Sequence, residues 1–356
     1  MDKNLKRDEH ARENALARPA SERELAKRYD RIKKYLMGHM DAFVFDTFSD
    51  EYLKKTKLED IMKDVPIPLR KEDMEGFRSE KGLPLTLIGE NMARVIGIDP
   101  RFRHAEAYAA FLFRFLSRRA AEPLVKKAKN AADKEDYDEA CIYFRAALVL
   151  KPDDLAAMYG YARVCRAMYN KSNDAAYIGN FKAESLDYLE LLTELHPKFG
   201  QGWYYLGYMY LNLGLYTKAY LAWESFLPRS RVAKDRREIK QRMDQIQTPM
   251  EIERGYNEVL AGRWQDGLRI LEPFRESVYK DWWPLWYYMG EAYLNLGRPG
   301  EAKDAFHRVL KLNGTHTETM EELMTLYNVE GNQEMVAKYH DKIALIRSGS
   351  EVTIVE

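Results

Sequence analysis

Two stretches of the chain are nearly identical: Trp203-Tyr-Tyr-Leu-Gly-Tyr-Met-Tyr-Leu-Asn-Leu-Gly214 and Trp286-Tyr-Tyr-Met-Gly-Glu-Ala-Tyr-Leu-Asn-Leu-Gly297. Residues four and seven positions apart share one face of a helix, so the first tryptophan, the first glycine and the last tyrosine form one stripe in each stretch. A glycine inside a helix costs about 1 kcal/mol relative to alanine. Its place in this stripe predicts that another helix crosses there at close range. The glycine that ends each stretch predicts a left-handed helix terminus.

A second helical pattern follows each stretch, with a small residue and then an aromatic one turn later. These pairs are Ala219 with Trp223 and Ala302 with Phe306. The template recurs, less well preserved, in four further places that begin near Leu124, Met158, Gly255 and Met320. The spacing resembles the tetratricopeptide repeat, a helix-turn-helix unit of about 34 residues. This resemblance implies an all-α fold, a right-handed α-solenoid of about six such repeats over residues 121–350.

Two segments interrupt the predicted array. Residues 170–181 delay the second helix of one repeat, and we expect them to form an inserted loop. Residues 232–247 are charged nearly throughout, but their few apolar positions have helical spacing, which predicts an extra helix. Because charged helical faces are usually solvated, this helix is interpreted as a spacer, with a basic partner-binding patch as the alternative.

The first third of the chain carries no clear repeat. Residues 1–20 are predicted to be a frayed or disordered arm, and residues 351–356 a short tail. Between them and the array, residues 21–120 are predicted to form a helical cap. It would begin with one long amphipathic helix from Ser21 to Phe43, and residues 102–119 would cover the first repeat. A separately folded domain is the alternative interpretation.

Composition excludes several classes of function. The 56 lysines and arginines balance the 56 aspartates and glutamates, which disfavours a nucleic-acid binder. Apolar runs are too short for a membrane span, and the charged N-terminal stretch does not resemble a signal peptide, so a cytoplasmic location is expected. The two cysteines, Cys141 and Cys165, are expected to be buried thiols.

Motifs for chemistry are scarce in the sequence. The histidines and cysteines lack metal-ligand spacing, and no phosphate-binding loop is present, so neither a metal nor a cofactor is expected. The fragment Phe43-Val-Phe-Asp46 resembles the opening of a haloacid-dehalogenase-type phosphatase, but the glycine-threonine that should follow is missing. We interpret it as an aromatic helix end. An enzyme carried by residues 1–120 remains an alternative.

The tetratricopeptide resemblance also implies a concave groove lined by the first helices of the repeats. The residues expected to bind a ligand there are Tyr159, Arg163, Arg166, Tyr204, Tyr208, Asn212, Tyr256, Tyr287, Glu291 and Asn295. The sequence therefore predicts a non-enzymatic protein-protein interaction scaffold. Its partner would be a protein or peptide with acidic and aromatic or apolar anchors. A peptide-responsive regulator or sensor is the alternative function.

Overall fold

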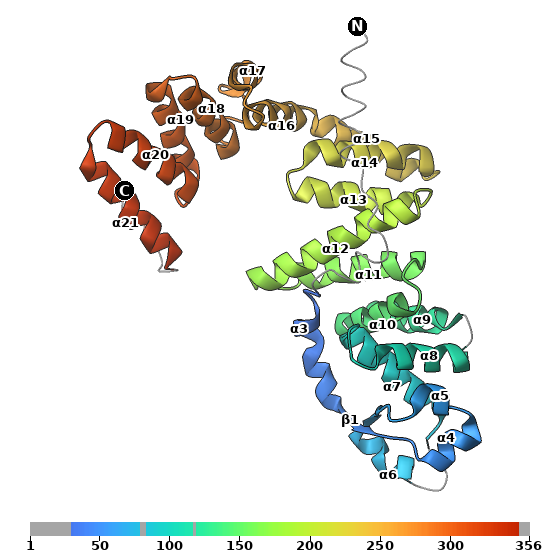
Figure 1. Cartoon of the computed structure of the whole chain (residues 1–356). Coiled ribbons are helices and arrows are strands. Elements are labelled where there is room, and N and C mark those ends of the chain that lie inside the picture. Colours follow the sequence, from blue (N-terminus) through green and yellow to red (C-terminus); the bar gives the residue numbers. More distant parts are fainter. Residues whose placement is uncertain (1–29, 79–82, 117–118, 349–356) are drawn as a thin grey trace. The chain divides into compact units, whose positions relative to one another are not determined.

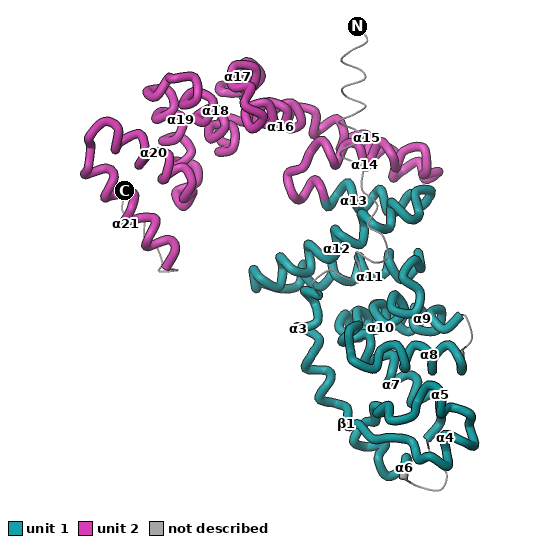
Figure 2. The backbone as a smooth tube through the Cα atoms, viewed as in Figure 1, with its two compact units in different colours: residues 1–209 teal, residues 210–356 magenta. Residues whose placement is uncertain are grey.

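The computed structural model describes residues 30–78, 83–116 and 119–348, and Figure 1 shows their arrangement in helices. The predicted arm, the predicted tail and the start of the predicted long helix lie outside these residues. The chain divides into two compact units, Met1–Met209 and Tyr210–Glu356 (Figure 2). Their boundary falls inside one of the two helices that carry the duplicated stretch.

The repeats are antiparallel helix pairs, as the sequence predicts. In unit 1 they are α9 Ala121–Asp133 with α10 Tyr137–Leu150, and α11 Leu155–Asn170 with α12 Ala175–Leu195. Next along the chain come α13 Gly200–Asn212 and α14 Tyr216–Phe226, followed by η4 Leu227–Arg229. Unit 2 continues with α15 Ala233–Gln245, α16 Gln247–Leu260, α17 Trp264–Leu271, η5 Glu272–Phe274, α18 Trp283–Asn295, α19 Pro299–Leu312, α20 Thr317–Val329 and α21 Gln333–Arg347. The described residues of the array are thus all-α.

Glycine defines both the turns and the closest helix contacts. Gly214, Gly262, Gly297 and Gly331 each follow the first helix of a pair with φ between 71° and 75°, a conformation that glycine adopts without a steric penalty. A Cβ atom at Gly290 would lie 2.5 Å from the Phe306 ring, so this helix crossing is as close as the sequence predicts. Trp203 and Trp286 differ from expectation because they are only half-buried. Their indole Nε1 atoms donate to Pro197 and Lys280 carbonyls at 2.9 and 2.7 Å.

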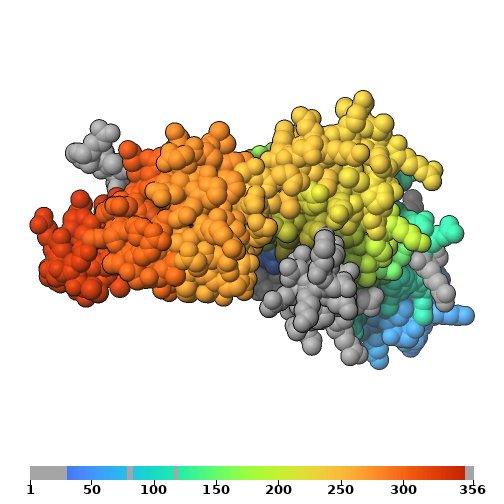
Figure 3. Space-filling model, turned by 90° about the horizontal axis from the view of Figure 1, so that it is seen from above, coloured from blue at the N-terminus to red at the C-terminus, as the bar shows by residue number. Residues whose placement is uncertain are grey.

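The predicted insertion is not a loop. Only residues 171–174 connect α11 to α12, and α12 begins at Ala175, where the Asp174 side chain accepts a hydrogen bond from the Tyr177 amide. The extra residues therefore lengthen the second helix of the repeat. The charged segment forms the separate helix α15, as predicted, with Ile239 and Met243 buried beneath its charged face. Figure 3 shows this yellow-to-orange stretch at the surface of the molecule.

The N-terminal region differs most from the sequence prediction. Instead of one long helix, residues 30–46 contain α3 Lys33–Leu36, η1 Met37–Ala42 and the strand β1 Phe43–Asp46. β1 pairs antiparallel with β2 Ile67–Arg70, with Phe43 opposite Arg70 and Asp46 opposite Ile67. Ile32 and Leu36 are fully buried, so the apolar positions are correct and the predicted helix is wrong. A tertiary strand partner overrides the local helical spacing here.

The remaining elements of this region are α4 Asp50–Thr56, α5 Glu59–Met62, η2 Lys71–Asp73, α6 Met74–Arg78, α7 Leu85–Ile98 and α8 Ala105–Leu116. The helix that packs directly on the first repeat is α7, whereas α8 packs on α7 and α5. A Cβ atom at Gly97 of α7 would lie 2.1 Å from the Ile142 carbonyl oxygen of α10. The prediction that residues 102–119 cover the first repeat is therefore wrong, because the preceding helix α7 covers it.

Candidate functional site

In unit 1, side chains from two successive first helices form an arginine–tyrosine cluster. We define it as Tyr159, Arg163 and Arg166 of α11 with Tyr204, Tyr205 and Tyr208 of α13. The four- and three-residue spacings in α11 place its three members on one helix face. The α11 helix begins where the Asp154 side chain accepts the Ala157 amide at 3.0 Å. The structure thus brings together the five predicted residues of this unit and adds Tyr205.

Tyr205 is the ring at which the two arginines converge. The Arg163 guanidinium carbon lies 5.5 Å from the Tyr159 ring centre and 5.8 Å from that of Tyr205, and the Arg166 carbon lies 5.5 Å from the Tyr205 ring centre. These distances are in the range of cation–π interactions. The Tyr204 ring contacts both Tyr205 and Tyr208, at centre distances of 5.2 and 5.1 Å.

The electrostatics of this cluster are unbalanced. Burial, together with neighbouring Tyr205, raises the pKa of Tyr159 to about 12, although Arg163 opposes the shift, so this phenol is neutral at physiological pH. Arg163 is exposed and Arg166 half-buried. Among the described residues, neither arginine forms an ion pair with a carboxylate. The cluster therefore presents two positive charges beside apolar rings.

Unit 2 contains a tyrosine–glutamate cluster, which we define as Tyr256 of α16, Tyr287, Tyr288 and Glu291 of α18, and Glu322 of α20. Tyr256 and Tyr288 stack with ring centres 4.6 Å apart, and Tyr287 lies 5.4 Å from Tyr288. Burial and the nearby Glu322 charge raise the pKa of Glu291 to about 7. The Oε1 atom of Glu291 is buried and has no hydrogen-bond partner among the described residues.

The two predicted asparagines lie at helix ends. Asn212 and Asn295 are exposed at the ends of α13 and α18. The Asn295 amide donates to the Glu291 carbonyl of its own helix at 2.9 Å. Contact with a ligand backbone stays a prediction for both.

The sequence analysis did not identify Tyr288 and Glu322 as site residues. The sequence signal for Tyr288 was the repeated Tyr-Tyr pair. The second tyrosine of each pair, Tyr205 or Tyr288, contacts the first helix of the preceding repeat.

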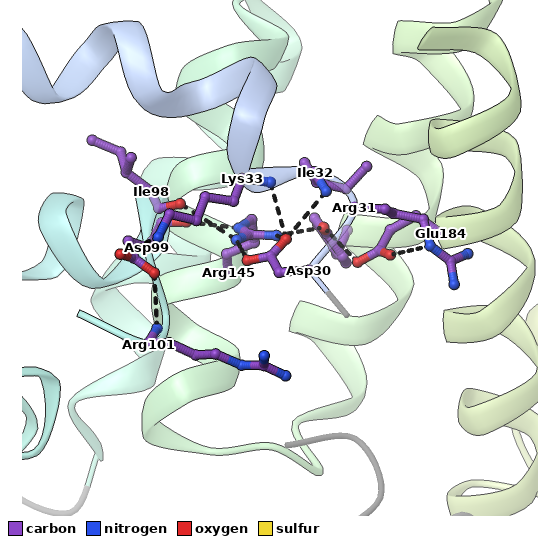
Figure 4. Close-up of polar contacts among 11 residues, drawn as sticks. Asp30, Arg31, Ile32, Lys33, Ile98, Asp99, Arg101, Arg145 and Glu184 are labelled. Atoms are coloured by element: carbon purple, nitrogen blue, oxygen red, sulfur yellow. Dashed lines mark hydrogen bonds and ion pairs between the residues drawn. The ribbon is translucent and has the colours of Figure 1, made fainter. Parts of the chain in front are cut away.

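A buried ion-pair network was entirely unexpected from sequence (Figure 4). Arg145 of α10 is 5 % exposed, and its Nη2 atom lies 2.5 Å from the Asp30 carboxylate. Burial alone would raise the pKa of Asp30, but the hydrogen bonds and charge of Arg145 lower it below its usual value. Arg145 stands in an apolar run of α10 and its partner is 115 residues away, so no local pattern reveals the pair.

Asp46, the residue behind the enzyme alternative, lies at the end of a strand and not of a helix. Its carboxylate accepts the Thr47 amide at 2.9 Å, and the strand belongs to an antiparallel pair. The resembled phosphatases would need an alternating strand-helix domain after this residue, whereas the short helices α4 and α5 follow it. No helix among residues 30–78, 83–116 and 119–348 has the length and apolarity to cross a membrane.

Comparisons with known proteins agree with the repeat geometry. Two family profiles described as tetratricopeptide repeat match residues 121–154 and 283–316. These ranges contain the pairs α9–α10 and α18–α19. A search of curated protein sequences finds no match to this chain.

Solved structures of repeat proteins resemble the chain at low identity. A tetratricopeptide repeat protein from Parabacteroides merdae is 14% identical, with 72% of this chain and 92% of that chain covered and a TM-score of 0.30. YrrB, described as a TPR protein with an unusual peptide-binding site, is 14% identical, with 66% and 98% covered and a TM-score of 0.31. MamA from Desulfovibrio magneticus is 14% identical, with 54% and 97% covered and a TM-score of 0.30.

The family matches fall on helix pairs that the structure describes. The α18–α19 pair has a close crossing at Gly290 and a left-handed turn residue at Gly297, and the α9–α10 pair has a left-handed turn residue at Glu135. On these grounds the chain contains tetratricopeptide repeats at residues 121–154 and 283–316.

Proposed function

We propose that this repeat scaffold for protein-protein interaction binds an acidic segment of a partner protein at the arginine–tyrosine cluster of unit 1. The observation that supports the proposal is the pair Arg163 and Arg166, two cations without a carboxylate partner among the described residues. Both lie against tyrosine rings that are half-buried. The cluster would offer a partner charge-assisted hydrogen bonds and an apolar platform side by side.

The expected partner segment has one or two carboxylates followed by one or two aromatic or large apolar residues. Hydrogen bonds to charged groups contribute about 1.5–3 kcal/mol each, and burial of a large side chain contributes about 1.5–3 kcal/mol. Two of each give about 6–12 kcal/mol before the costs of association. Micromolar affinity, about 8 kcal/mol, is therefore the expected upper range.

The tyrosine–glutamate cluster of unit 2 would select against acidic residues. An approaching carboxylate would meet Glu322 and the ionised fraction of Glu291, whose pKa is raised to about 7 by burial and by the Glu322 charge. Carboxylates close to one another repel, so an aromatic, neutral or basic part of a partner is favoured there. We infer that the acidic part of a partner is read by unit 1.

The test compares charge reversal at two places with equal change in net charge. Fluorescently labelled peptides with two aspartates and one tryptophan are titrated with the wild type, with Arg163→Glu/Arg166→Glu, and with the control Arg254→Glu/Arg269→Glu. The control arginines form exposed pairs with Glu251 and Asp266 in unit 2. We expect at least a tenfold loss of affinity for the first variant only.

Two further measurements complete the design. Circular dichroism establishes that each variant is folded, and a peptide with lysines in place of the aspartates tests the charge preference. Equal affinity of the wild type for both peptides, or equal losses in the two variants, would remove the arginine–tyrosine cluster as the binding surface.

A further inference from the structure

The structure contains a short chain segment that is bound to unit 1 almost entirely through side chains. We call residues 30–36 the docked segment. Its helix α3 has only four residues. Two of its own backbone amides, those of Ile32 and Lys33, are bonded to the Asp30 carboxylate at 3.1 and 3.0 Å. Apart from local hydrogen bonds such as that from the Tyr35 amide to the Ile32 carbonyl at 3.0 Å, its long polar side chains reach residues distant in sequence, so the surface of unit 1 determines its position.

The acidic end of the docked segment binds the buried Arg145 guanidinium, which other groups of unit 1 also hold (Figure 4). The Arg145 Nε atom donates to the Gly97 carbonyl at 2.7 Å, and its Nη1 atom lies 3.3 Å from the Tyr161 hydroxyl. The remaining donors reach the two Asp30 oxygens at 3.1 and 2.5 Å. Removal of the segment would leave a buried guanidinium with donors aimed at a missing carboxylate.

The next residue of the segment meets charges of the opposite sign. The Arg31 Nη2 atom lies 3.1 Å from the Asp187 carboxylate of α12, and its Nε atom lies 3.9 Å from Glu184 of the same helix. Adjacent aspartate and arginine therefore find a cation on α10 and two carboxylates on α12. This alternation of charges fixes the direction in which a chain can lie on the surface.

Apolar and aromatic anchors complete the recognition. Ile32 and Leu36 are fully buried. The Tyr35 ring packs on those of Tyr177 and Phe181 of α12, with centres 4.8 and 5.5 Å apart, and the Tyr35 hydroxyl accepts from Asn180 at 3.0 Å. These α12 residues belong to the extra turns that lengthen this repeat, so the elongation builds the platform for Tyr35.

The chain beyond the segment is less buried, although its His39 Nε2 atom lies 3.4 Å from the Asp138 carboxylate of α10. The following η1 contributes no buried side chain, and a Cβ atom at Gly38 would meet nothing within 4 Å. Firm contact resumes at Phe43, where β1 begins. A partner that displaces the docked segment would also break the contact of His39 with Asp138, whereas the strand pair β1–β2 has its own backbone pairing.

We propose that this side of α10 and α12 is a second recognition surface, which binds a segment of the type Asp-Arg-apolar-Lys-x-Tyr-apolar, and that the chain's own residues 30–36 occupy it as an intramolecular ligand. The lysine position is included because the Lys33 Nζ atom lies 2.7 Å from the Asp99 carboxylate. A partner protein with such a segment must displace the docked segment to bind. The surface is formed by other residues than the arginine–tyrosine cluster, so this inference is independent of the function proposed above.

The test uses the full chain and a peptide with the sequence of residues 30–38, acetylated, amidated and labelled with fluorescein. The variant Asp30→Ala/Arg31→Ala/Tyr35→Ala weakens the docked segment and leaves the surface intact. A tethered segment competes at an effective concentration of about 1 mM. We therefore expect the peptide to bind the triple variant at least tenfold more tightly than the wild type.

Specificity is tested with altered peptides. The substitution Asp30→Asn in the peptide keeps the size of the side chain but removes the negative charge that pairs with Arg145. We expect it to weaken peptide binding at least tenfold. The peptide with Arg31→Glu should also bind poorly, and the additional substitution Asp187→Arg in the triple variant should restore part of that binding. Such a reciprocal rescue locates Arg31 beside α12.

Circular dichroism and a thermal melt establish that the variants are folded. Should the triple variant unfold, the single variant Tyr35→Ala serves in its place, with hydrogen exchange of residues 30–36 measured with and without excess peptide. The proposal is overturned if a folded variant binds no peptide at about 1 mM. It is also overturned if the asparagine peptide binds as well as the aspartate peptide.

Discussion

Tyr205 of unit 1 and Tyr288 of unit 2 hold the same place in the duplicated stretch, yet they have different neighbours. Tyr205 receives Arg163 and Arg166 from the preceding first helix, whereas Tyr288 stacks on Tyr256. One turn later the stretch has Tyr208 in unit 1 and Glu291 in unit 2. The repeat thus fixes where a ring lies. In unit 1 the preceding first helix makes its surroundings cationic, whereas in unit 2 Glu291 of the same helix and Glu322 of the following first helix make them acidic.

The largest expected loss of stability concerns the close helix crossings, where the glycine faces backbone atoms in unit 1 and a side chain in unit 2. Gly97→Ala should cost at least about 3 kcal/mol, because the new methyl group meets the Ile142 backbone, 2.1 Å away, which cannot move freely. Gly290→Ala should cost less, about 1–2 kcal/mol, since it meets only the movable Phe306 ring. Urea unfolding followed by circular dichroism measures both.

Gly300→Ala is the control for these two variants. A Cβ atom there would meet nothing within 4 Å, and alanine favours the helix. The control should be neutral or slightly stabilised. Equal losses at Gly97 and Gly290 would contradict the distinction between backbone and side-chain neighbours.

The duplicated tryptophans give the next largest effect. Because both are half-buried, Trp203→Ala and Trp286→Ala should each cost about 1–3 kcal/mol. Trp223→Ala should cost about 3–5 kcal/mol, since Trp223 is fully buried. The same unfolding experiment ranks the three, and a loss at Trp203 as large as that at Trp223 would place the indole in the core.

A transplant of one contact would sharpen the comparison of Tyr205 with Tyr288. Tyr256→Arg should place a guanidinium on the Tyr288 ring, as Arg166 lies on Tyr205. We expect affinity for the aspartate peptide in unit 2 to rise by up to about fivefold, because an exposed ion pair between the new guanidinium and a peptide carboxylate contributes about 0.2–1 kcal/mol. An Arg163→Glu/Arg166→Glu background isolates this effect in the peptide titration. No gain there would mean that Glu291 and Glu322 dominate the site.

The smallest expected effect is a pH dependence confined to unit 2. Since the pKa of Glu291 rises from 4.5 to about 7 on folding, the unfolded chain loses this proton first. Stability should therefore fall as pH rises from about 4.5 to about 7, and Glu291→Gln should remove that part of the decline. With solvent screening, we expect about 1 kcal/mol at pH 8.

Thermal unfolding at about pH 4 and about pH 8 makes this measurement. The glutamine variant should exceed the wild type only at the higher pH. A gain of the same size at both values would point to packing and not to ionisation.

Local patterns predicted the helix pairs, the turn glycines and five members of the unit 1 cluster, because these features depend on residues close in sequence. The strand pair β1–β2 and the contact of Arg145 with Asp30 could not be predicted in this way. Each depends on a partner far along the chain, and the local apolar spacing of residues 32–43 is equally compatible with a helix. Tyr205 was not predicted because the groove positions that the tetratricopeptide resemblance implies include only the first tyrosine of each Tyr-Tyr pair.

The link between Asp30 and Arg145 has a consequence for the kinetics of unit 1. A contact across 115 residues closes a long loop, so it should form after the helix pairs have assembled. Interactions that form after the rate-limiting step change unfolding rates more than folding rates. Asp30→Ala should therefore leave the refolding rate nearly unchanged and accelerate unfolding. The docked segment would then determine how long unit 1 stays folded and have little influence on how fast it folds.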